Sequence, residues 1–243
     1  MFHFEWSQFQ TYLIQAEQEG LVRRTFLRLS PQRQQAVIYA ILEEATERGP
    51  AALNIKNVAR RANVSIGSLY QYFGDRDNML NFAIELCARY MTEAFNLYRP
   101  YLLAMPLREA LAAYLVGGIE WSRAEAGLMQ FFARAAYQGD SELADRLVRP
   151  IANTLKGMVG DILHQAAQRG EIRPDVDLEA TTNLIHALTV IAGDSQLLPY
   201  LNNYFQILDA RVTPERSLTA LLDLVMVGIG IDPQTNERVC DGK

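Results

Sequence analysis

Cysteine and histidine are scarce in this sequence, and their positions restrict the chemistry that it can support. The 243 residues include two cysteines and three histidines. Cys87 and Cys240 lie far apart and match no spacing typical of a metal site, as expected for a protein kept in a reducing cytoplasm. One histidine, His164, has a carboxylate three residues earlier, Asp161. A di-iron site in a helical bundle needs two such pairs and further carboxylates, so we expect no metal and no cofactor.

Long apolar runs are also absent. The longest is LLDLVMVGIGI at residues 221–231, which contains Asp223 and is shorter than the roughly 20 residues that cross a bilayer. The first residues, MFHFEWSQFQ, lack the basic stretch before an apolar segment that marks a secretory signal. We therefore expect a cytoplasmic protein with no membrane partner.

Common catalytic motifs are missing from the chain as well. It contains no glycine-rich phosphate loop, no HExxH motif and no nucleophile elbow. A helical-bundle enzyme whose Ser, His and Asp meet only in space stays open as an alternative, because such a site leaves no local signature. We expect that the protein is not an enzyme.

Positive charge is concentrated in one part of an acidic chain. The formal net charge is −5 and the pI is about 5.3, which disfavours nonspecific coating of nucleic acid. Residues 31–76, however, carry four acidic side chains and six basic ones, which are Arg33, Arg48, Lys56, Arg60, Arg61 and Arg76. This segment is suited to a local contact with phosphates.

Helical patterns run through almost the whole chain, and none predicts a strand, so the fold class is all-α. Ser30-Pro31 predicts a helix start, and Gly49-Pro50 its end. Asp77 is placed to cap a long helix from about Asn78 to Arg99, ended by Pro100. Pro150 should kink or split the helix that starts at Ser141. Further helices are predicted to begin at Pro106, Ala124, Leu178, about Pro199, and Pro214.

Three parts follow from these patterns. Residues 1–30 form an N-terminal helical extension or arm, residues 31–76 a small three-helix domain, and residues 77–243 a larger helical domain. The long helix joins the second part to the third. Repeats and low-complexity tracts are absent.

The small domain has the proportions of a helix-turn-helix, because two short helices are joined by the turn Ala62-Asn63-Val64. Asn54 and Ser65 can cap these helices, and Asn63 suits a positive φ in the turn. Residues that can fill the space between the helices are Val58, Ala59, Ala62, Val64 and Leu69. The second helix then presents an outward face made of Ile66, Gly67, Ser68, Gln71 and Tyr72.

This outward face carries groups that bind DNA. Gly67 and Ser68 allow close approach of the backbone, and the carboxamide of Gln71 can form two hydrogen bonds with an adenine edge. Hydroxyl groups and positive charges bind phosphates, and the candidates are Tyr70, Tyr72, Lys56 and Arg76. Short helices with these residues also occur as plain packing, and the spacing alone does not separate the two interpretations.

The stretch GPAALNIKNVARRANVSIGSLYQYFGDRDNML resembles the N-terminal domain of the TetR family of transcriptional regulators. It departs from the family pattern at Asn54, Asn63 and Asp75, where Thr, Gly and Ser or Asn are usual. The positions that agree are Gly49, Ile55, Val58, Ala59, Ala62, Val64, Ser65, Gly67, Ser68, Leu69, Tyr70, Tyr72, Phe73, Arg76, Asp77 and Leu80.

The resemblance implies a ligand-responsive regulator, usually a repressor, that binds a pseudo-palindromic operator in double-stranded DNA as a homodimer. Residues Ser65 to Tyr72 then form the recognition helix, with Ile66, Gly67, Ser68 and Gln71 toward the base edges. The implied phosphate contacts are Asn54, Lys56, Tyr70, Tyr72 and Arg76. A protein-interaction module that makes no sequence-specific DNA contact is the alternative.

In the larger domain, aromatic and methionine side chains suit a cavity for an apolar or aromatic effector. The candidate residues are Tyr114, Trp121, Met129, Phe132, Tyr137, Met158 and His186. The same stripe is also typical of an ordinary core. The two most apolar late helices, at about 178–195 and 214–231, are predicted to form a four-helix interface with a second copy.

The N-terminal extension leaves two interpretations open. Phe2, Trp6, Phe9 and Leu13 recur at helical spacing, which favours an amphipathic helix packed on its own domain or on the partner. The alternative is an arm that inserts Arg23 and Arg24 into the minor groove.

Overall fold

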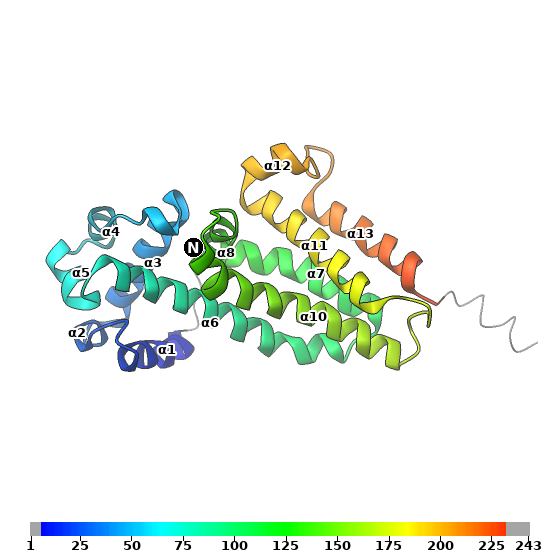
Figure 1. The fold of residues 1–243 in the computed structure, drawn as a ribbon, viewed down its shortest axis with the longest axis horizontal. Helices are drawn as coiled ribbons and strands as arrows, with labels where there is room; N and C mark the ends of the chain where they lie inside the picture. The colour runs from blue at the N-terminus through cyan, green and yellow to red at the C-terminus, as the bar shows by residue number, and fades with distance from the viewer. Residues whose placement is uncertain (1–5, 232–243) are drawn as a thin grey trace, which may run out of the picture. The chain divides into compact units, whose positions relative to one another are not determined.

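The computed structural model describes residues 6–231, and within this range the regular elements are helices (Figure 1). One isolated antiparallel bridge joins Ile172 to Gly230. The all-α prediction is therefore confirmed. Phe2 and Cys240 lie outside the described residues, as do the side chains of Trp6 and Phe9.

The N-terminal elements follow the predicted starts and stops. Pro31 occupies the first position of α3, which ends at Gly49, a residue with φ of 87°. Such a φ is accessible to glycine at little cost. The elements in order are α1 (Trp6–Gln18), α2 (Arg24–Leu27), α3 (Pro31–Arg48), the 3₁₀ turn η1 (Pro50–Ala52), α4 (Ile55–Ala62) and α5 (Ile66–Phe73).

The later helices begin within two residues of the predicted positions, and caps explain several of the starts. Asp177 accepts a hydrogen bond from the N–H of Ala180, and Thr213 from that of Arg216. These elements are α6 (Arg76–Leu103), α7 (Leu107–Ala124), α8 (Ala126–Ala136), α9 (Ser141–Leu143), the π turn η2 (Ala144–Val148), α10 (Arg149–Gln168), α11 (Leu178–Leu197), α12 (Pro199–Phe205) and α13 (Pro214–Ile229).

Two predictions about α6 are wrong. Asp75 caps this helix instead of Asp77, because its Oδ1 lies 2.7 Å from the N–H of Asn78. Pro100 does not end the helix, which continues to Leu103. Proline removes one backbone donor, but the N–H of Ala104 still bonds the carbonyl of Pro100. Leu102, 1% exposed, anchors this last turn in the core.

A π turn interrupts the helical run from Ser141 just before Pro150, where a kink or a split was predicted. The π turn η2 separates the short α9 from α10 and ends two residues before the proline. A wider turn of this kind interrupts the regular hydrogen bonding of an α-helix.

The chain divides into two compact units. Unit 1 is Met1–Thr92 with Ala124–Ile151, and unit 2 is Glu93–Arg123 with Ala152–Lys243. These units differ from the predicted division at residue 77, because the first half of α6 belongs to the same unit as α1–α5. The helix α6 therefore contributes residues to both units.

Unit 1 has an apolar core. Large side chains with less than 2% exposure come from several of its helices, among them Ile41 in α3, Leu69 in α5 and Phe131 in α8. Thr46 donates a hydrogen bond to the carbonyl of Gly127 at 3.2 Å, which joins α3 to α8. Arg146 contacts Asn81 and Glu85 of α6.

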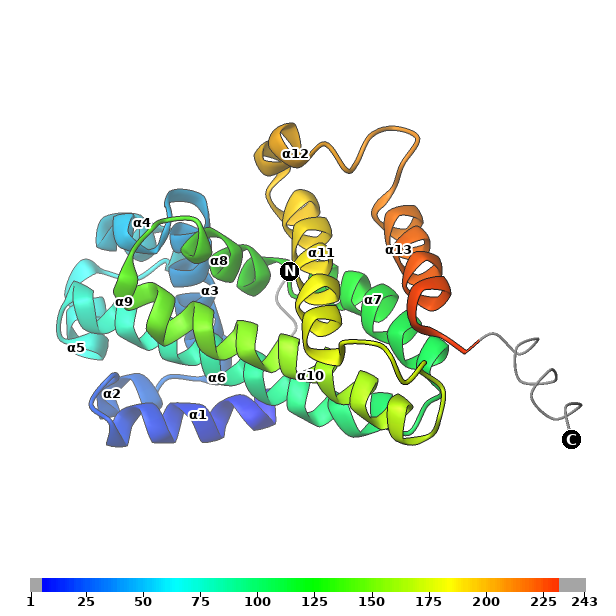
Figure 2. The same ribbon diagram turned by 45° about the vertical axis from the view of Figure 1, so that its right-hand side comes forward.

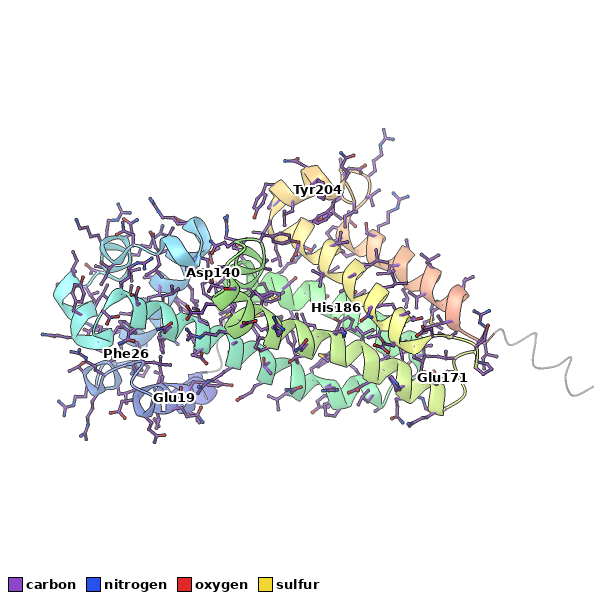
Figure 3. The ribbon with its side chains drawn as sticks, in the orientation of Figure 1. Glu19, Phe26, Asp140, Glu171, His186 and Tyr204 are labelled. Carbon is purple, nitrogen blue, oxygen red and sulfur yellow. The ribbon has the colours of Figure 1, made fainter. Side chains whose placement is uncertain are left out.

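Unit 2 is built from the second half of α6, α7, and α10–α13. In Figure 2, α11 and α13 run side by side, and α12 lies at one end of α11. Glu171, labelled in Figure 3, accepts the N–H of Leu107 and pairs with Arg169. Arg169 also donates to the carbonyls of Leu103 and Met105, so this pair closes the turn between α6 and α7.

Candidate nucleic-acid interface

The turn between α4 and α5 has the geometry that its residues predict. Asn54 accepts a hydrogen bond from the N–H of Lys56 at 2.9 Å, and Ser65 accepts one from that of Ser68 at 3.0 Å. Asn63 has φ of 52° and ψ of 48°, the left-handed conformation that Asn tolerates. Both caps and the turn residue are therefore confirmed.

The two helices meet through small and branched side chains. Val58 and Leu69 are fully buried, and Ala59 and Ala62 are less than 10% exposed. Val64 is half-buried. The predicted packing of the helix-turn-helix is therefore confirmed.

An exposed face of α5 carries most of the predicted base-reading residues. Ile66, Gly67, Tyr70 and Gln71 are exposed, and Ile66 and Tyr70 are 37% and 45% exposed. Ser68 is half-buried, and its hydroxyl lies 2.9 Å from that of the capping Ser65. Among the described residues, the carboxamide of Gln71 has no hydrogen-bond partner.

Tyr72 does not belong to this exposed face, contrary to the prediction. It is 8% exposed, and its ring lies 5.6 Å from that of Phe26. Helical periodicity places residue 72 beside the buried Leu69 and Phe73, and Phe26 of α2 covers this side of α5. The N-terminal extension, which the helix-turn-helix pattern does not include, buries the tyrosine.

The two predicted phosphate contacts with positive charge have different surroundings. Lys56 is exposed in the first turn of α4. Arg76 donates to the carbonyl of Leu53 at 2.8 Å and pairs with Asp77 at 3.1 Å, while 40% of its side chain remains exposed. Arg76 therefore holds the segment before α4, in addition to its predicted contact with a DNA phosphate.

A buried carboxylate, which the sequence did not single out, joins α3 to α4. Glu44 is 0% exposed. Its Oε1 accepts a hydrogen bond from Asn57 at 2.9 Å and lies 3.3 Å from Arg48. Its Oε2 lies 3.4 Å from Nε of Arg61, without the alignment of a hydrogen bond. Arg61 also pairs with Glu47. Only tertiary packing distinguishes Glu44 from its exposed neighbours.

The seven predicted pocket residues divide between the two units. Tyr114, Trp121, Met158 and His186 belong to unit 2, and the other three belong to unit 1. In unit 1, Met129 is half-buried, Phe132 is 7% exposed and Tyr137 is 45% exposed.

Within unit 2, three of the predicted residues lie in or against the core. Tyr114 and Met158 are part of the main apolar cluster. Trp121 is half-buried, and its ring lies 4.8 Å from that of Phe95. His186, labelled in Figure 3, is also half-buried. Burial and the nearby Lys156 lower its pKa, which favours the neutral ring.

Unit 1 contains another buried carboxyl group that the sequence did not indicate. Glu125 precedes α8 and is 4% exposed. Burial raises its pKa to about 6, against a hydrogen bond from Tyr90 that lowers it. Its Oε2 has no hydrogen-bond partner among the described residues. A glutamate at a helix start is usually solvated, so no local sequence pattern predicts that Glu125 is buried.

Unit 2 leaves an apolar strip exposed on α11 and α13. The side chains are Leu184, Leu188, Leu224 and Val227, with exposures of 64%, 43%, 69% and 84%. Soluble proteins rarely expose such a group unless another surface covers it.

The fold and the exposed face of α5 define the class of protein. It has a helix-turn-helix unit followed by a helical C-terminal part. Residues 37–82 match the family described as bacterial regulatory proteins, tetR family, and residues 107–207 match the C-terminal domain of SbtR-like transcriptional regulators. Together the two matches cover more than half of the chain. The chain belongs to the TetR family of transcriptional regulators, and it is a regulator rather than an enzyme.

Individual relatives agree with this family. The regulator BetI of Stenotrophomonas maltophilia is 30% identical over 114 residues, which cover 45% of this chain and 58% of BetI. The repressor KstR2 of Mycobacterium tuberculosis is 26% identical over 152 residues, which cover 60% of this chain and 72% of KstR2. A crystal structure of a TetR family regulator from Chloroflexus aurantiacus has a TM-score of 0.59 at 17% identity, over 87% of this chain and 99% of that one.

Two further features concern the described residues alone. None of the helices between residues 6 and 231 is long and apolar enough to cross a membrane. The same residues contain no cluster of three or more His, Cys, Asp or Glu side chains that could hold a metal ion.

Proposed function

We propose that this regulator binds a pseudo-palindromic operator as a homodimer, reads it with α5, and leaves it when a small apolar or aromatic effector binds. Repression is the expected action. The observation that carries the proposal is the exposed face of α5, which combines Gly67 and Gln71 with a helix-turn-helix fold.

Gly67 supports a close contact with a ligand outside the protein. It lies in the first turn of α5, where any residue fits the backbone. A Cβ atom added there would meet only Ser65 Oγ, at the ordinary contact distance of 3.6 Å. The fold therefore does not require glycine at this position, whereas close approach of a DNA backbone favours the absence of a side chain.

Substitutions in the interface should separate base reading from phosphate binding. Gln71→Ala is expected to reduce discrimination between operator and random DNA by about 1–3 kcal/mol, because it removes a bidentate base contact. Lys56→Ala should weaken binding to both DNAs and lower the slope of log Kd against log salt by about one unit. Fluorescence anisotropy with DNA from upstream of the protein's own gene measures both effects.

Lys156→Ala is the matched control, because Lys156 is also exposed but lies on α10. This substitution should change neither the discrimination between operator and random DNA nor the salt slope. Equal losses on operator and random DNA for Gln71→Ala would contradict the base-reading role. The absence of any operator preference in the unchanged protein would favour the alternative, a protein-interaction module.

Dimerisation is supported by the apolar strip on α11 and α13. A symmetric dimer can engage two half-sites about 34–36 Å apart, and an obligate interface buries roughly 2,000 Å² or more. The four exposed side chains of the strip suit the centre of such an interface.

The effector site is best supported in unit 2, near Trp121. This ring is half-buried against Phe95 of α6, and α6 begins directly after the recognition helix. An effector that displaces this part of α6 could alter the separation of the two recognition helices. Its effect is limited by its difference in affinity for the two states.

Operator DNA should weaken effector binding by the same factor by which the effector weakens operator binding. This reciprocity is a thermodynamic requirement, and the expected factor is about 5 to 150. Calorimetry with apolar and planar compounds that bind the protein, with and without operator, measures it. Trp121→Ala should weaken effector binding in both conditions. A compound whose affinity is the same with and without operator is not an inducer.

A further inference from the structure

A basic segment of the N-terminal extension lies outside the helix-turn-helix. From Gly20 to Arg33 the chain contains no Asp or Glu, and its four arginines, Arg23, Arg24, Arg28 and Arg33, are all exposed. Within residues 6–231, none of the four forms an ion pair or a side-chain hydrogen bond. Most other arginines of the structure do pair, as Arg89 does with Glu19. The segment therefore presents uncompensated positive charge.

Hydrogen bonds fix this segment to the end of the recognition helix. The N–H of Arg23 donates to the carbonyl of Tyr72 at 2.7 Å, and the hydroxyl of Thr25 donates to the carbonyl of Gln71 at 2.6 Å. The last four carbonyls of a helix lack partners within it. The N-terminal segment therefore satisfies two carbonyls of α5 that would otherwise be free.

Apolar packing adds to these bonds. Phe26 of α2 is 0% exposed, and its ring lies 5.6 Å from Tyr72, 5.2 Å from Phe73 and 6.1 Å from Phe82. Figure 3 labels this residue on α2. On the other side, Gln34 donates to the carbonyls of Phe26 and Leu27. The helix α2 is thus held rigidly beside the element proposed to enter the major groove (Figure 2).

Arg24 and Arg28 project from the side of α2 opposite to Phe26. They are four residues apart in helical backbone, since Arg28 keeps φ of −80° and ψ of −6°. This spacing places them one turn apart on the same side, whereas Phe26 lies about half a turn from both. One side of α2 is therefore anchored in the core, and the other carries two free guanidinium groups.

We propose that Arg24 and Arg28 bind backbone phosphates of the DNA that flanks the half-site read by α5. The proposal rests on the proposed function, because it adds a contact to the same complex. Arginine forms strong charge-assisted hydrogen bonds with phosphate. The extension therefore widens the DNA contact of the family's helix-turn-helix by one rigid element.

Phosphates fit this element better than the floor of the minor groove. Side chains that enter the minor groove come from flexible arms or from wedges that kink the duplex. The helix α2 is instead short, hydrogen-bonded at both ends and packed through Phe26. We therefore favour contacts with the DNA backbone over the alternative interpretation, in which an arm inserts Arg23 and Arg24 into the minor groove.

The test compares Arg24→Ala/Arg28→Ala with the unchanged protein on an operator duplex that has long flanks. The slope of log Kd against log salt is expected to fall by about one unit for each lost phosphate contact. The affinity at 0.15 M salt should fall by about fivefold for each contact. Arg24→Lys/Arg28→Lys should recover most of the slope, because charge is retained. Circular dichroism should show unchanged folding, since both side chains are exposed.

Arg108→Ala/Arg123→Ala is the matched control. It removes the same charge from α7 of unit 2, where the two side chains are 56% and 51% exposed. This control should keep the slope of the unchanged protein. If Arg24→Ala/Arg28→Ala has the same salt slope as the unchanged protein, the proposal is overturned. A loss of affinity that depends on the base sequence of the flanks would also overturn it. If the unchanged protein binds no operator, the proposed function itself fails, which is a distinguishable result.

Discussion

Leu224→Glu combined with Val227→Glu is expected to convert the proposed dimer into a monomer and to lower operator affinity by at least about 100-fold. These side chains are 69% and 84% exposed on α13, and in the proposed dimer they lie in the apolar interface. Four carboxylates facing one another there would lose hydration without gaining partners. A monomer engages one half-site and loses the factor of roughly 10² to 10⁴ that linked binding supplies.

Size-exclusion chromatography with light scattering at about 10 μM, followed by operator titration, measures both effects. Ile14→Glu is the control, because Ile14 is an exposed apolar residue of α1. It should leave the protein dimeric. A dimer that survives the double substitution with unchanged operator affinity would show that the interface lies elsewhere.

Glu44→Ala is expected to destabilise unit 1 by about 3 kcal/mol. The substitution removes a fully buried carboxylate that contacts Asn57, Arg48 and Arg61. Breaking a buried ion pair costs about 3–5 kcal/mol when the other charge stays buried. Arg61 retains 24% exposure and a second partner, Glu47, so the lower end of this range applies. Because Glu44 joins α3 to α4, operator affinity should fall as well.

Urea unfolding at one fixed protein concentration, followed by circular dichroism, measures the loss. Glu43→Ala is the matched control, because Glu43 is the adjacent residue and pairs with the same Arg61, but its side chain is 52% exposed. It should change the free energy of unfolding by less than about 1 kcal/mol. Similar losses for the two variants would show that burial of Glu44 does not determine its contribution.

Local chemistry explains why the helix-turn-helix could be predicted in detail. Asn54, Asn63 and Ser65 act on backbone groups within three residues of themselves, so their roles depend on sequence spacing alone. The same spacing predicts the buried Val58 and Leu69 and the exposed Gly67 and Gln71. Helix starts at capping residues and prolines follow from the same local rules.

Long-range contacts explain the failures. Tyr72 is buried by Phe26, which lies 46 residues earlier in the chain. Pro100 is tolerated in α6 because Leu102 anchors the following turn in the core. The predicted pocket residues remain a prediction, and the division of these residues between the two units also depends on tertiary structure.

The amino-acid sequence alone determined the fold class, the helix boundaries near caps, and the face of α5 that carries Gly67 and Gln71, because these follow from interactions within one or two helical turns. Tertiary structure alone decided that Glu44 joins α3 to α4 and that α2 lies against the end of α5. Those arrangements depend on side chains brought together from distant segments. Burial then makes each contact strong, and no periodicity in the sequence records which partners will meet.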